Sequence, residues 1–453
     1  MAAELLPVGA ENATEGEQHA MEDGDGDNAP PMDAPAMNTE DSDAENNYGT
    51  PPDVVAAVEF FNELDGGQTV VFGRNPSIAS YVRTIVASEA ATSASGAFAA
   101  EVAAAVHRAA DAVAAAVGAA KGEALDDCFG AGVALCDALR ELELGDAGDA
   151  AQEAVAAAGE ALWAAGGAAK ASGVAPRLLP YVLLRSLGED ATGGDVRRAL
   201  KAQGMVDLID FGDGSSGTLL GLLARTAAAP AFVKHAHGRS FVGGLLGGAC
   251  EVLAAATHKT VKAQLPLASP GLALHYGDCY FRAWEHAAKR EALEDFEECR
   301  LQDLARAALF CRDGRLADRL KLVLDRALHE RKGRPGVDGT IERVYAPLLW
   351  RHLSCPKAAA RKRAVAILAA AFPVVADTAK ASKKEAVGLA LEDQLERLRC
   401  ACVDDASPDV RAAACAGAAT CVSRYWDALP RGSAGRLVKA LASTCARDLF
   451  WVV

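Results

Sequence analysis

The sequence contains one glycine pattern that could bind a cofactor. Gly212, Gly214 and Gly217 form a G-x-G-x-x-G that follows apolar residues and precedes a helical pattern. In dinucleotide-binding enzymes such glycines let the backbone approach the pyrophosphate, and an acid about 20 residues later holds the ribose. Residues 231–250 contain no Asp or Glu, and no alternating strands surround the glycines. A dinucleotide-binding enzyme is therefore the least favoured alternative, and a Gly-Ser loop between helices is expected.

The remaining reactive residue types form no catalytic pattern. His235 and His237 make an H-x-H, which a helix would direct to different faces. The twelve cysteines lack the paired C-x-x-C or Cys and His spacings of zinc sites. Without a secretory signal they are expected to be reduced thiols that pack as small hydrophobes. The sequence predicts no active site, cofactor, metal or small-molecule substrate.

A basic stretch is the stronger functional signal. Residues 306–363 contain 15 Lys and Arg against 6 acids, a net charge of +9. This stretch is either a solvated face that balances acids elsewhere or a surface that neutralises phosphates. No alternation of aromatic and basic residues suited to base stacking accompanies it, so binding would not depend on base sequence. On the second interpretation the candidate DNA contacts are Arg331, Lys332, Arg334, Lys357, Arg361, Lys362 and Arg363.

Two pairs of helical patterns follow one another in the last part of the chain. The first pair is IERVYAPLLWRHLS and AAARKRAVAILAAAF, joined by CPK, and the second is LEDQLERLRCACV and VRAAACAGAATCVSRYW, joined by DDASPD. The pairs are offset by 50 residues, from Arg361 to Arg411. That spacing is close to the roughly 40–47 residues of HEAT repeats once an insertion at 374–390 is allowed. Leu391, Leu395, Leu398 and Cys402 should share one buried face.

The connection DDASPDVR has the residue types of a HEAT turn. Its acids and Ser-Pro end one helix and begin the next, because Pro408 suits the first turn of a helix. Val410 is expected in the core between the two helices. Arg411 is expected to reach an acid of a neighbouring turn, with Asp405 as its partner, and so to join successive repeats. A capped helix start in another kind of bundle is the alternative; we assign Asp405, Pro408, Val410 and Arg411 to the architecture of the repeat.

Composition divides the chain into four parts. Residues 1–73 contain 17 acids and no Lys or Arg, and residues 1–54 are poor in bulky apolar side chains. No secretory signal and no apolar window of about 18 residues is present, so no membrane span is expected. Breaks near Gly145, Gly166 and Gly173 suggest short helices. The predicted parts are a disordered acidic tail (1–54), an Ala-rich helical region (55–175), a helical repeat region (176–335) and HEAT repeats (336–453).

Several stretches resemble a known family. They are LLRSLGEDATGGDVRR (183–198), KTVKAQL (259–265), YFRAW (280–284), GVDGTIERVYAPLLWRHL (336–353), AFP (371–373) and DDASPDVRAAACAGAATCVSRYW (404–426). In order and spacing they resemble the G-type HEAT subunit of condensin, in its condensin II form. The resemblance implies an all-α, HEAT-repeat-like α-solenoid without an active site. It also implies partners: the kleisin subunit, the SMC ATPase pair through the complex, and duplex DNA in chromatin.

That family acts in mitotic chromosome condensation, so the resemblance implies a location in the nucleus on chromosomes. Family members extend for many more repeats, whereas this chain ends at RDLFWVV. We therefore expect a truncated solenoid with an exposed apolar end at 450–453, because terminal repeats normally carry a polar cap. HEAT adaptors of other classes, such as transport receptors or phosphatase scaffolds, remain the main alternative, since the HEAT turn alone would fit them.

Overall fold

The computed structural model describes residues 52–62, 77–87, 96–141, 145–171, 173–212, 216–375 and 384–449. Every extended regular element in these ranges is a helix, and the ranges contain no strand. The predicted acidic tail lies outside the described residues except for its last few, because α1 begins at Pro52. Gly214 and the apolar end at 450–453 also lie outside them. The described part of the chain is an all-α solenoid, as the sequence predicts.

The helices follow in three groups. The first group is α1 (Pro52–Asn62), α2 (Ser77–Ala87), α4 (Gly96–Val117), α5 (Glu123–Glu141), α6 (Gly145–Ala171), α7 (Ala175–Leu187) and α8 (Gly193–Lys201). The second is α9 (Gly217–Thr226), α10 (Pro230–Lys234), α11 (Ala236–Leu246), α12 (Glu251–Gln264), α13 (Pro270–Lys289), α14 (Leu293–Phe296), α15 (Gln302–Phe310) and α16 (Gly314–Ala327). The third is α17 (Val337–Leu353), α18 (Ala358–Ala371), α19 (Lys384–Val403), α20 (Pro408–Tyr425) and α21 (Arg431–Leu449).

Short turns of other helix types connect some of them. The 3₁₀ turns are η1 (Gln203–Leu208), η4 (His329–Arg331) and η6 (Trp426–Ala428), and η3 (Glu297–Leu301) is a π-helical turn. Each helix packs against helices one to three places away in the chain, with extensive contacts in the pairs α4–α6, α11–α13, α13–α16, α18–α20 and α19–α21. This pattern is typical of stacked helix pairs whose core is built from neighbour to neighbour.

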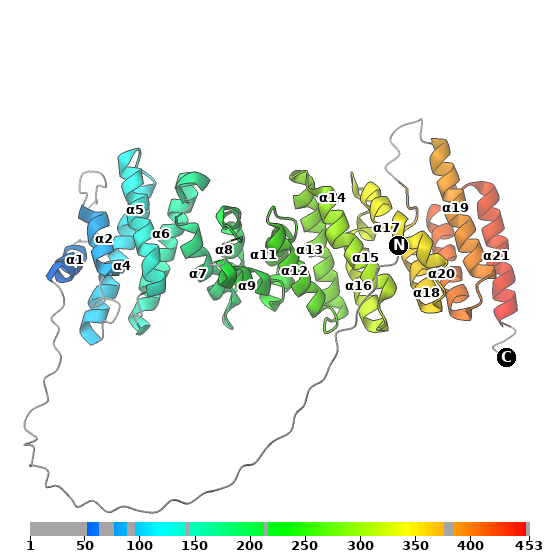
Figure 1. Cartoon of the computed structure of the whole chain (residues 1–453), viewed down its shortest axis with the longest axis horizontal. Coiled ribbons are helices and arrows are strands. Elements are labelled where there is room, and N and C mark those ends of the chain that lie inside the picture. The colour runs from blue at the N-terminus through cyan, green and yellow to red at the C-terminus, as the bar shows by residue number, and fades with distance from the viewer. Residues whose placement is uncertain are drawn as a thin grey trace, which may run out of the picture. The chain divides into compact units, whose positions relative to one another are not determined.

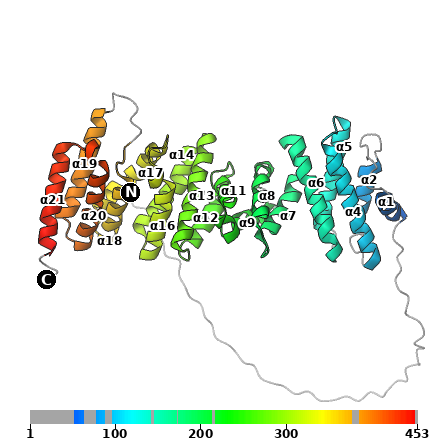
Figure 2. The same ribbon diagram turned by 180° about the vertical axis from the view of Figure 1, so that it is seen from behind.

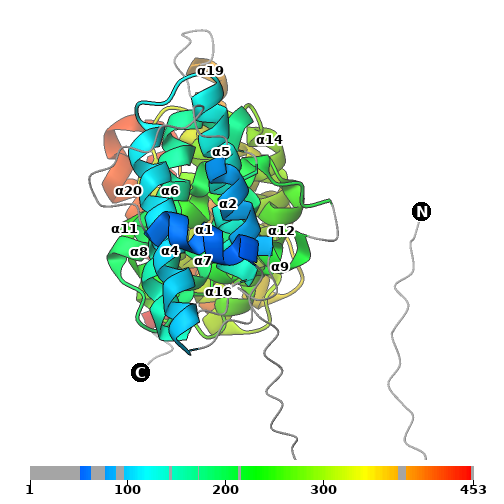
Figure 3. The ribbon, with the colours of Figure 1, turned by 90° about the vertical axis from the view of Figure 1, so that its left-hand side faces the viewer.

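The described helices form one row from α1 to α21 in which successive pairs follow chain order, and near its end α20 lies beside α18 and α19 beside α21 (Figure 1). The same order is seen from behind (Figure 2). In the end-on view of Figure 3, α1 lies nearest the viewer and later helices lie behind it. Contacts between parts of the chain about 40–50 residues apart therefore recur along the row, and they position the polar residues considered below.

Local sequence explains where several helices begin. The Thr192 side chain and Asp195 form a reciprocal capping box at the start of α8. Ser269 caps α13 by accepting from the Leu272 amide at 3.2 Å, and Pro270 occupies the first helical position. The expected break at Gly166 is wrong, because α6 continues through it to Ala171. A glycine in a helix costs only about 1 kcal/mol relative to alanine, and the alanines around it sustain the helix.

The apolar pattern of the repeats is confirmed by burial. Leu391, Leu395, Leu398 and Cys402 are all buried on one face of α19. On the facing side of the pair, α20 buries Val410, Ala414 and Ala418. Small residues also let α20 approach α18 closely, since a Cβ on Gly417 would lie 2.7 Å from the Ala369 Cβ of α18. The alanine-rich composition is therefore used for close helix packing.

Candidate nucleic-acid interface

The structure brings the seven predicted DNA contacts together as two groups. Arg331, Lys332 and Arg334 lie on and after η4, between α16 and α17. Lys357 precedes α18, and residues 361–363 lie on the first turns of that helix. In both groups some side chains are used inside the fold: Arg331, Lys332, Arg361 and Arg363 bond to other parts of the chain.

Arg361 joins two helix pairs at the turn formed by residues 404–408, which we call the hinge. Its Nε and Nη2 donate to the two carboxylate oxygens of Asp405 at 2.7 and 2.8 Å. Its Nη1 donates to the carbonyl oxygens of Cys355 and Pro356 at 2.8 and 2.9 Å. The side chains of Arg361 and Asp405 are only 16% and 9% exposed. These hydrogen bonds lower the pKa of the Asp405 carboxyl below its ordinary value, and Arg361 has few donors left for a phosphate.

Arg411 occupies the equivalent place one pair later. Its Nη1 donates to the carbonyl oxygens of Asp405 and Ala406 at 3.0 and 3.5 Å, the same two turn positions that Arg361 contacts in its own turn. The sequence predicted that Arg411 would be the partner that joins repeats at Asp405. In the structure the bidentate pair that crosses between repeats is made by Arg361.

The other hinge residues lie where a turn of this kind requires them. Asp405 Oδ1 accepts from the Ser407 amide at 2.8 Å, which closes the turn before α20. Pro408 is the first residue of α20, and Val410 is completely buried. The Asp405 carboxylate therefore accepts hydrogen bonds both from its own turn, at the Ser407 amide, and from Arg361 of the preceding repeat.

Arg331, Lys332 and Arg363 are also engaged within the fold. Arg331 Nη2 donates to Asp278 at 2.9 Å. Lys332 Nζ donates to the carbonyl oxygens of Ala371 and Pro373 at 2.7 and 2.6 Å, and burial lowers the pKa of Lys332 to about 8. Arg363 donates to the Cys311 carbonyl oxygen. Each of these three side chains bonds to a residue that is 39 to 53 positions away in the chain.

Arg334, Lys357 and Lys362 are the exposed members of the set. The Arg334 guanidinium lies 5.0 Å from the centre of the Phe281 ring. Lys362 Nζ lies 3.7 Å from Asp409, and the side chains are 50% and 76% exposed, so this pair contributes at most about 1 kcal/mol. A phosphate could replace Asp409 at little cost.

Two hollows of different charge flank α18. A cavity of about 390 Å³ is lined by Lys321, Lys362, Arg363, Asp318 and Asp409 among other residues, which gives its lining one excess positive charge. A cavity of about 490 Å³ is lined by Arg361, Arg397, Asp393, Glu396, Asp404 and Asp405 among others, which gives its lining two excess negative charges. Phosphate is therefore favoured on the side of Lys362 and opposed on the side of Arg361.

Sequence reasoning missed the polar networks that join the repeats. Asp278 is contacted by Arg326 Nε at 2.9 Å and Arg331 Nη2 at 2.9 Å, with Arg239 Nε at 3.6 Å. Buried His258 bonds the Tyr280 hydroxyl through Nδ1 at 2.6 Å and Asp303 through Nε2 at 2.9 Å. The partners lie 22 to 53 residues apart, so no local sequence signal could have identified them.

The glycine pattern is not accompanied by the elements of a dinucleotide site. Gly212 donates its amide to Asp210 Oδ1 at 2.8 Å, and Gly217 begins α9. The described residues contain no strand that could form the required parallel sheet. Within those ranges no group of three or more His, Cys, Asp or Glu could hold a metal ion. None of the helices that the structure describes is long and apolar enough to cross a membrane.

Comparison with known proteins gives matches to condensin II subunits. Residues 225–376 match the family described as "Condensin II non structural maintenance of chromosomes subunit". The predicted resemblance to condensin II is confirmed. The match to this condensin II family includes all seven candidate cations, whereas the hinge at Asp405 lies beyond it.

Individual relatives carry the condensin II name too. The chain is 29% identical over 260 residues to condensin-2 complex subunit G2 of Danio rerio, covering 57% of this chain and 22% of that protein. It is 27% identical over 268 residues to condensin-2 complex subunit G2 of Homo sapiens, covering 59% of this chain and 23% of that protein. The matched part thus spans less than a quarter of each of these curated relatives.

Proposed function

We propose that this chain is a non-catalytic, HEAT-type subunit of condensin II that binds the kleisin subunit and duplex DNA during mitotic chromosome condensation. The observation that carries the proposal is the match of residues 225–376 to the condensin II family, on a chain whose described part is a stack of helix pairs. Such a stack offers a long surface to an extended partner. The chain would act on nuclear chromosomes and would reach the SMC ATPase pair through the complex.

The DNA contacts in this proposal are the exposed cations. Arg334, Lys357 and Lys362 are exposed, and the one ion pair that the described residues give them, Lys362 with Asp409, is weak. Arg361, in contrast, cannot leave Asp405 without opening the hinge. Because binding of this kind depends on counterion release, it should be independent of base sequence and steeply dependent on salt. The role of the other three cations in this proposal is structural, because the side chains of Arg331, Lys332 and Arg363 already bond to other parts of the chain.

The test is a charge-reversal triple variant. Arg334→Glu, Lys357→Glu and Lys362→Glu together should weaken binding to a labelled DNA duplex. If three phosphate contacts are lost, the slope of log K against log salt should flatten by about 2.7. The matched control reverses three exposed cations outside the basic stretch, Arg197→Glu, Lys201→Glu and Lys259→Glu, and changes the net charge equally. Equal weakening by both triple variants would show that only net charge matters and would remove the assignment.

A further inference from the structure

The stack of helices has an open junction between α16 and α18. Extensive contacts join α11 to α13, α13 to α16, and α18 to α20, whereas α16 and α18, both fully described, share almost no contacts. The cavity of about 390 Å³ lined by Lys362, which we call the positive hollow, lies between them. Its lining comes from the N-terminal part of α16 and from α18 beginning at its first residue, Ala358. The two helices are therefore separated at their N-terminal ends.

Small side chains leave this space unfilled. The α16 wall includes Gly314 and Ala317, and the α18 wall includes Ala358, Ala359 and Ala366. Alanine and glycine faces let helices approach closely, as α18 and α20 do on the other side of α18. The two walls of the positive hollow can therefore approach each other without displacing a bulky side chain from these positions.

The opposite edge of the same junction is firmly held, along α15 and α17. Glu297 lies just before α15, is only 3% exposed, and accepts from Arg343 Nε and Nη2 at 2.5 and 2.7 Å. Thr340 of α17 donates to the same carboxylate at 2.5 Å. At the other end of α15, the rings of Phe310 and His352 lie edge to face, 4.4 Å apart. Both ends of α15 are thus attached to α17, and we call this edge the pivot.

Polar contacts limit how far the open side can move. At the C-terminal end of α18, Lys332 Nζ bonds the carbonyl oxygens of Ala371 and Pro373, and Lys332 follows α16 through η4. Near the N-terminal end, Arg363 donates to the Cys311 carbonyl oxygen at the end of α15. Among the described residues this is the one polar tether at that end. The junction is therefore closed at one end by Lys332 and held at the other by a single side chain.

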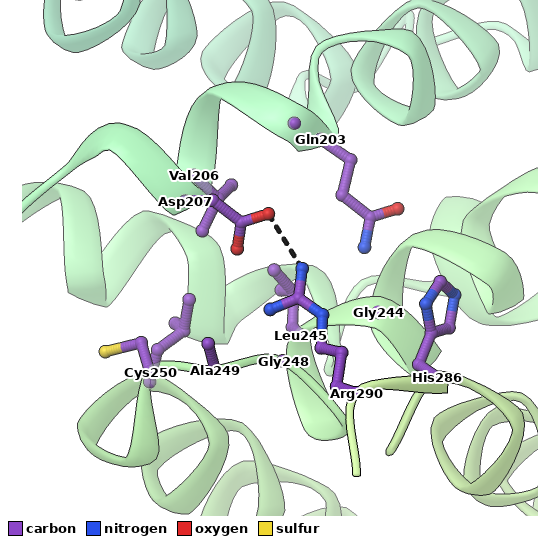
Figure 4. Close-up of a pocket in the computed structure, with 12 residues that line it drawn as sticks. Gln203, Val206, Asp207, Gly244, Leu245, Gly248, Ala249, Cys250, His286 and Arg290 are labelled. Carbon is purple, nitrogen blue, oxygen red and sulfur yellow. Dashed lines mark hydrogen bonds and ion pairs between the residues drawn. The ribbon is translucent and has the colours of Figure 1, made fainter. Parts of the chain in front are cut away.

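A second hollow shows that not every space between helices is a junction of this kind. It lies between η1, α11 and the end of α13 and has a volume of about 240 Å³ (Figure 4). Asp207 and Arg290 are bonded across it at 2.8 Å. Beside it α11 packs directly on α13, where a Cβ on Gly247 would lie 2.2 Å from the Ala283 carbonyl oxygen. Close packing and an ion pair hold these walls together, and α16 and α18 have neither.

We propose that the helices up to α16 and those from α17 onward are two rigid stacks that rock against each other about the pivot, opening and closing the positive hollow. Rotation of packed bodies about a few contacts is a common form of conformational change. Closure brings Asp318 of α16 toward the cations of α18, and Lys362 is available because its pair with Asp409 is exposed and weak. The motion belongs to this chain alone, so it does not depend on the proposed function.

Spin-label distance measurements on the full chain test the motion. Labels carried by unnatural amino acids avoid the twelve native cysteines. Labels at Lys259 and Lys439 lie on opposite sides of the junction, and labels at Lys357 and Lys439 lie on the same side, all at exposed positions. We expect the distance distribution of the first pair to be about twice as wide as that of the second. Equal widths would overturn the proposal.

A variant of the tether places the motion at this junction. Arg363→Ala removes the bond to Cys311, so it should widen the Lys259–Lys439 distribution further. The Lys357–Lys439 distribution should stay unchanged, which also shows that the variant is folded. Arg351→Ala, at an exposed position of α17, is the matched control and should change neither distribution. No widening by Arg363→Ala, or equal widening by Arg351→Ala, would show that the chain bends elsewhere.

Discussion

The ion pair between Arg361 and Asp405 allows a prediction about how the repeats hold together. The change is Asp405→Asn, which removes the charge and keeps an oxygen for the Ser407 amide. Two hydrogen bonds between charged groups become a single bond from the Arg361 guanidinium to a neutral amide oxygen, so at least one bond worth about 1.5–3 kcal/mol is lost. The two side chains keep 16% and 9% of their surface exposed, so solvent reduces the loss. We expect a cost of about 2 kcal/mol, below the about 3–5 kcal/mol of a fully buried pair.

The loss should be local, because a solenoid is stabilised by contacts between adjacent repeats. Native-state hydrogen exchange measures it: amides of α19 and α20 that exchange by local opening should exchange about 30-fold faster, since 1.4 kcal/mol is a factor of ten. Amides of α7 to α13 should be unaffected.

Lys362→Ala provides the control, because its pair with Asp409 is exposed and weak. A matched effect of Asp405→Asn and Lys362→Ala, or slow exchange of α19 in Asp405→Asn, would refute the reasoning. A double-mutant cycle with Arg361→Ala would then show where the coupling energy lies.

Two further predictions concern close packing and pH. Gly247→Ala should lower the free energy of unfolding by about 1–3 kcal/mol, because its Cβ would overlap the Ala283 carbonyl oxygen; Gly271→Ala, with open space around its Cβ, should raise it by about 0.4–1 kcal/mol. Urea unfolding of the two variants compares them, and equal effects would contradict the packing argument. Burial lowers the pKa of His329, so as pH falls below 6.5 the unfolded chain takes up a proton before the folded chain does and stability is lost. Between pH 7 and 5 the urea midpoint should therefore fall less steeply for His329→Gln than for the unmodified chain. Equal slopes would show that His329 does not cause this loss of stability.

Local pattern was enough to predict the elements of the fold. Helical periodicity and the Asp-Ala-Ser-Pro turn predicted the α19–α20 pair, and Val410 is buried as expected. These features depend on residues a few positions apart, whose physical effects do not need the tertiary structure. The same reasoning failed at Gly166, where neighbouring alanines outweigh the glycine.

The sequence could not distinguish the cations of α18. Arg361 and Lys362 are adjacent in a cluster of like residues, yet one is bound to Asp405, 44 residues away, and the other is exposed. Their difference follows from the stacking of one repeat on the next, which no local spacing encodes. The hollow of Figure 4 could not be predicted from the sequence for the same reason, because its lining residues are spread from position 203 to position 290.

Position on α18 also keeps the proposed DNA contact and the hinge independent. Lys362 lines the positive hollow with Asp409, and Arg361 lines the negative hollow with Asp405, so the proposed contact and the hinge lie on different faces of α18. A phosphate that displaces Asp409 breaks only an exposed pair of at most about 1 kcal/mol. The bidentate hinge would remain intact, so the proposed DNA contact at Lys362 does not require a change in how the helices pack.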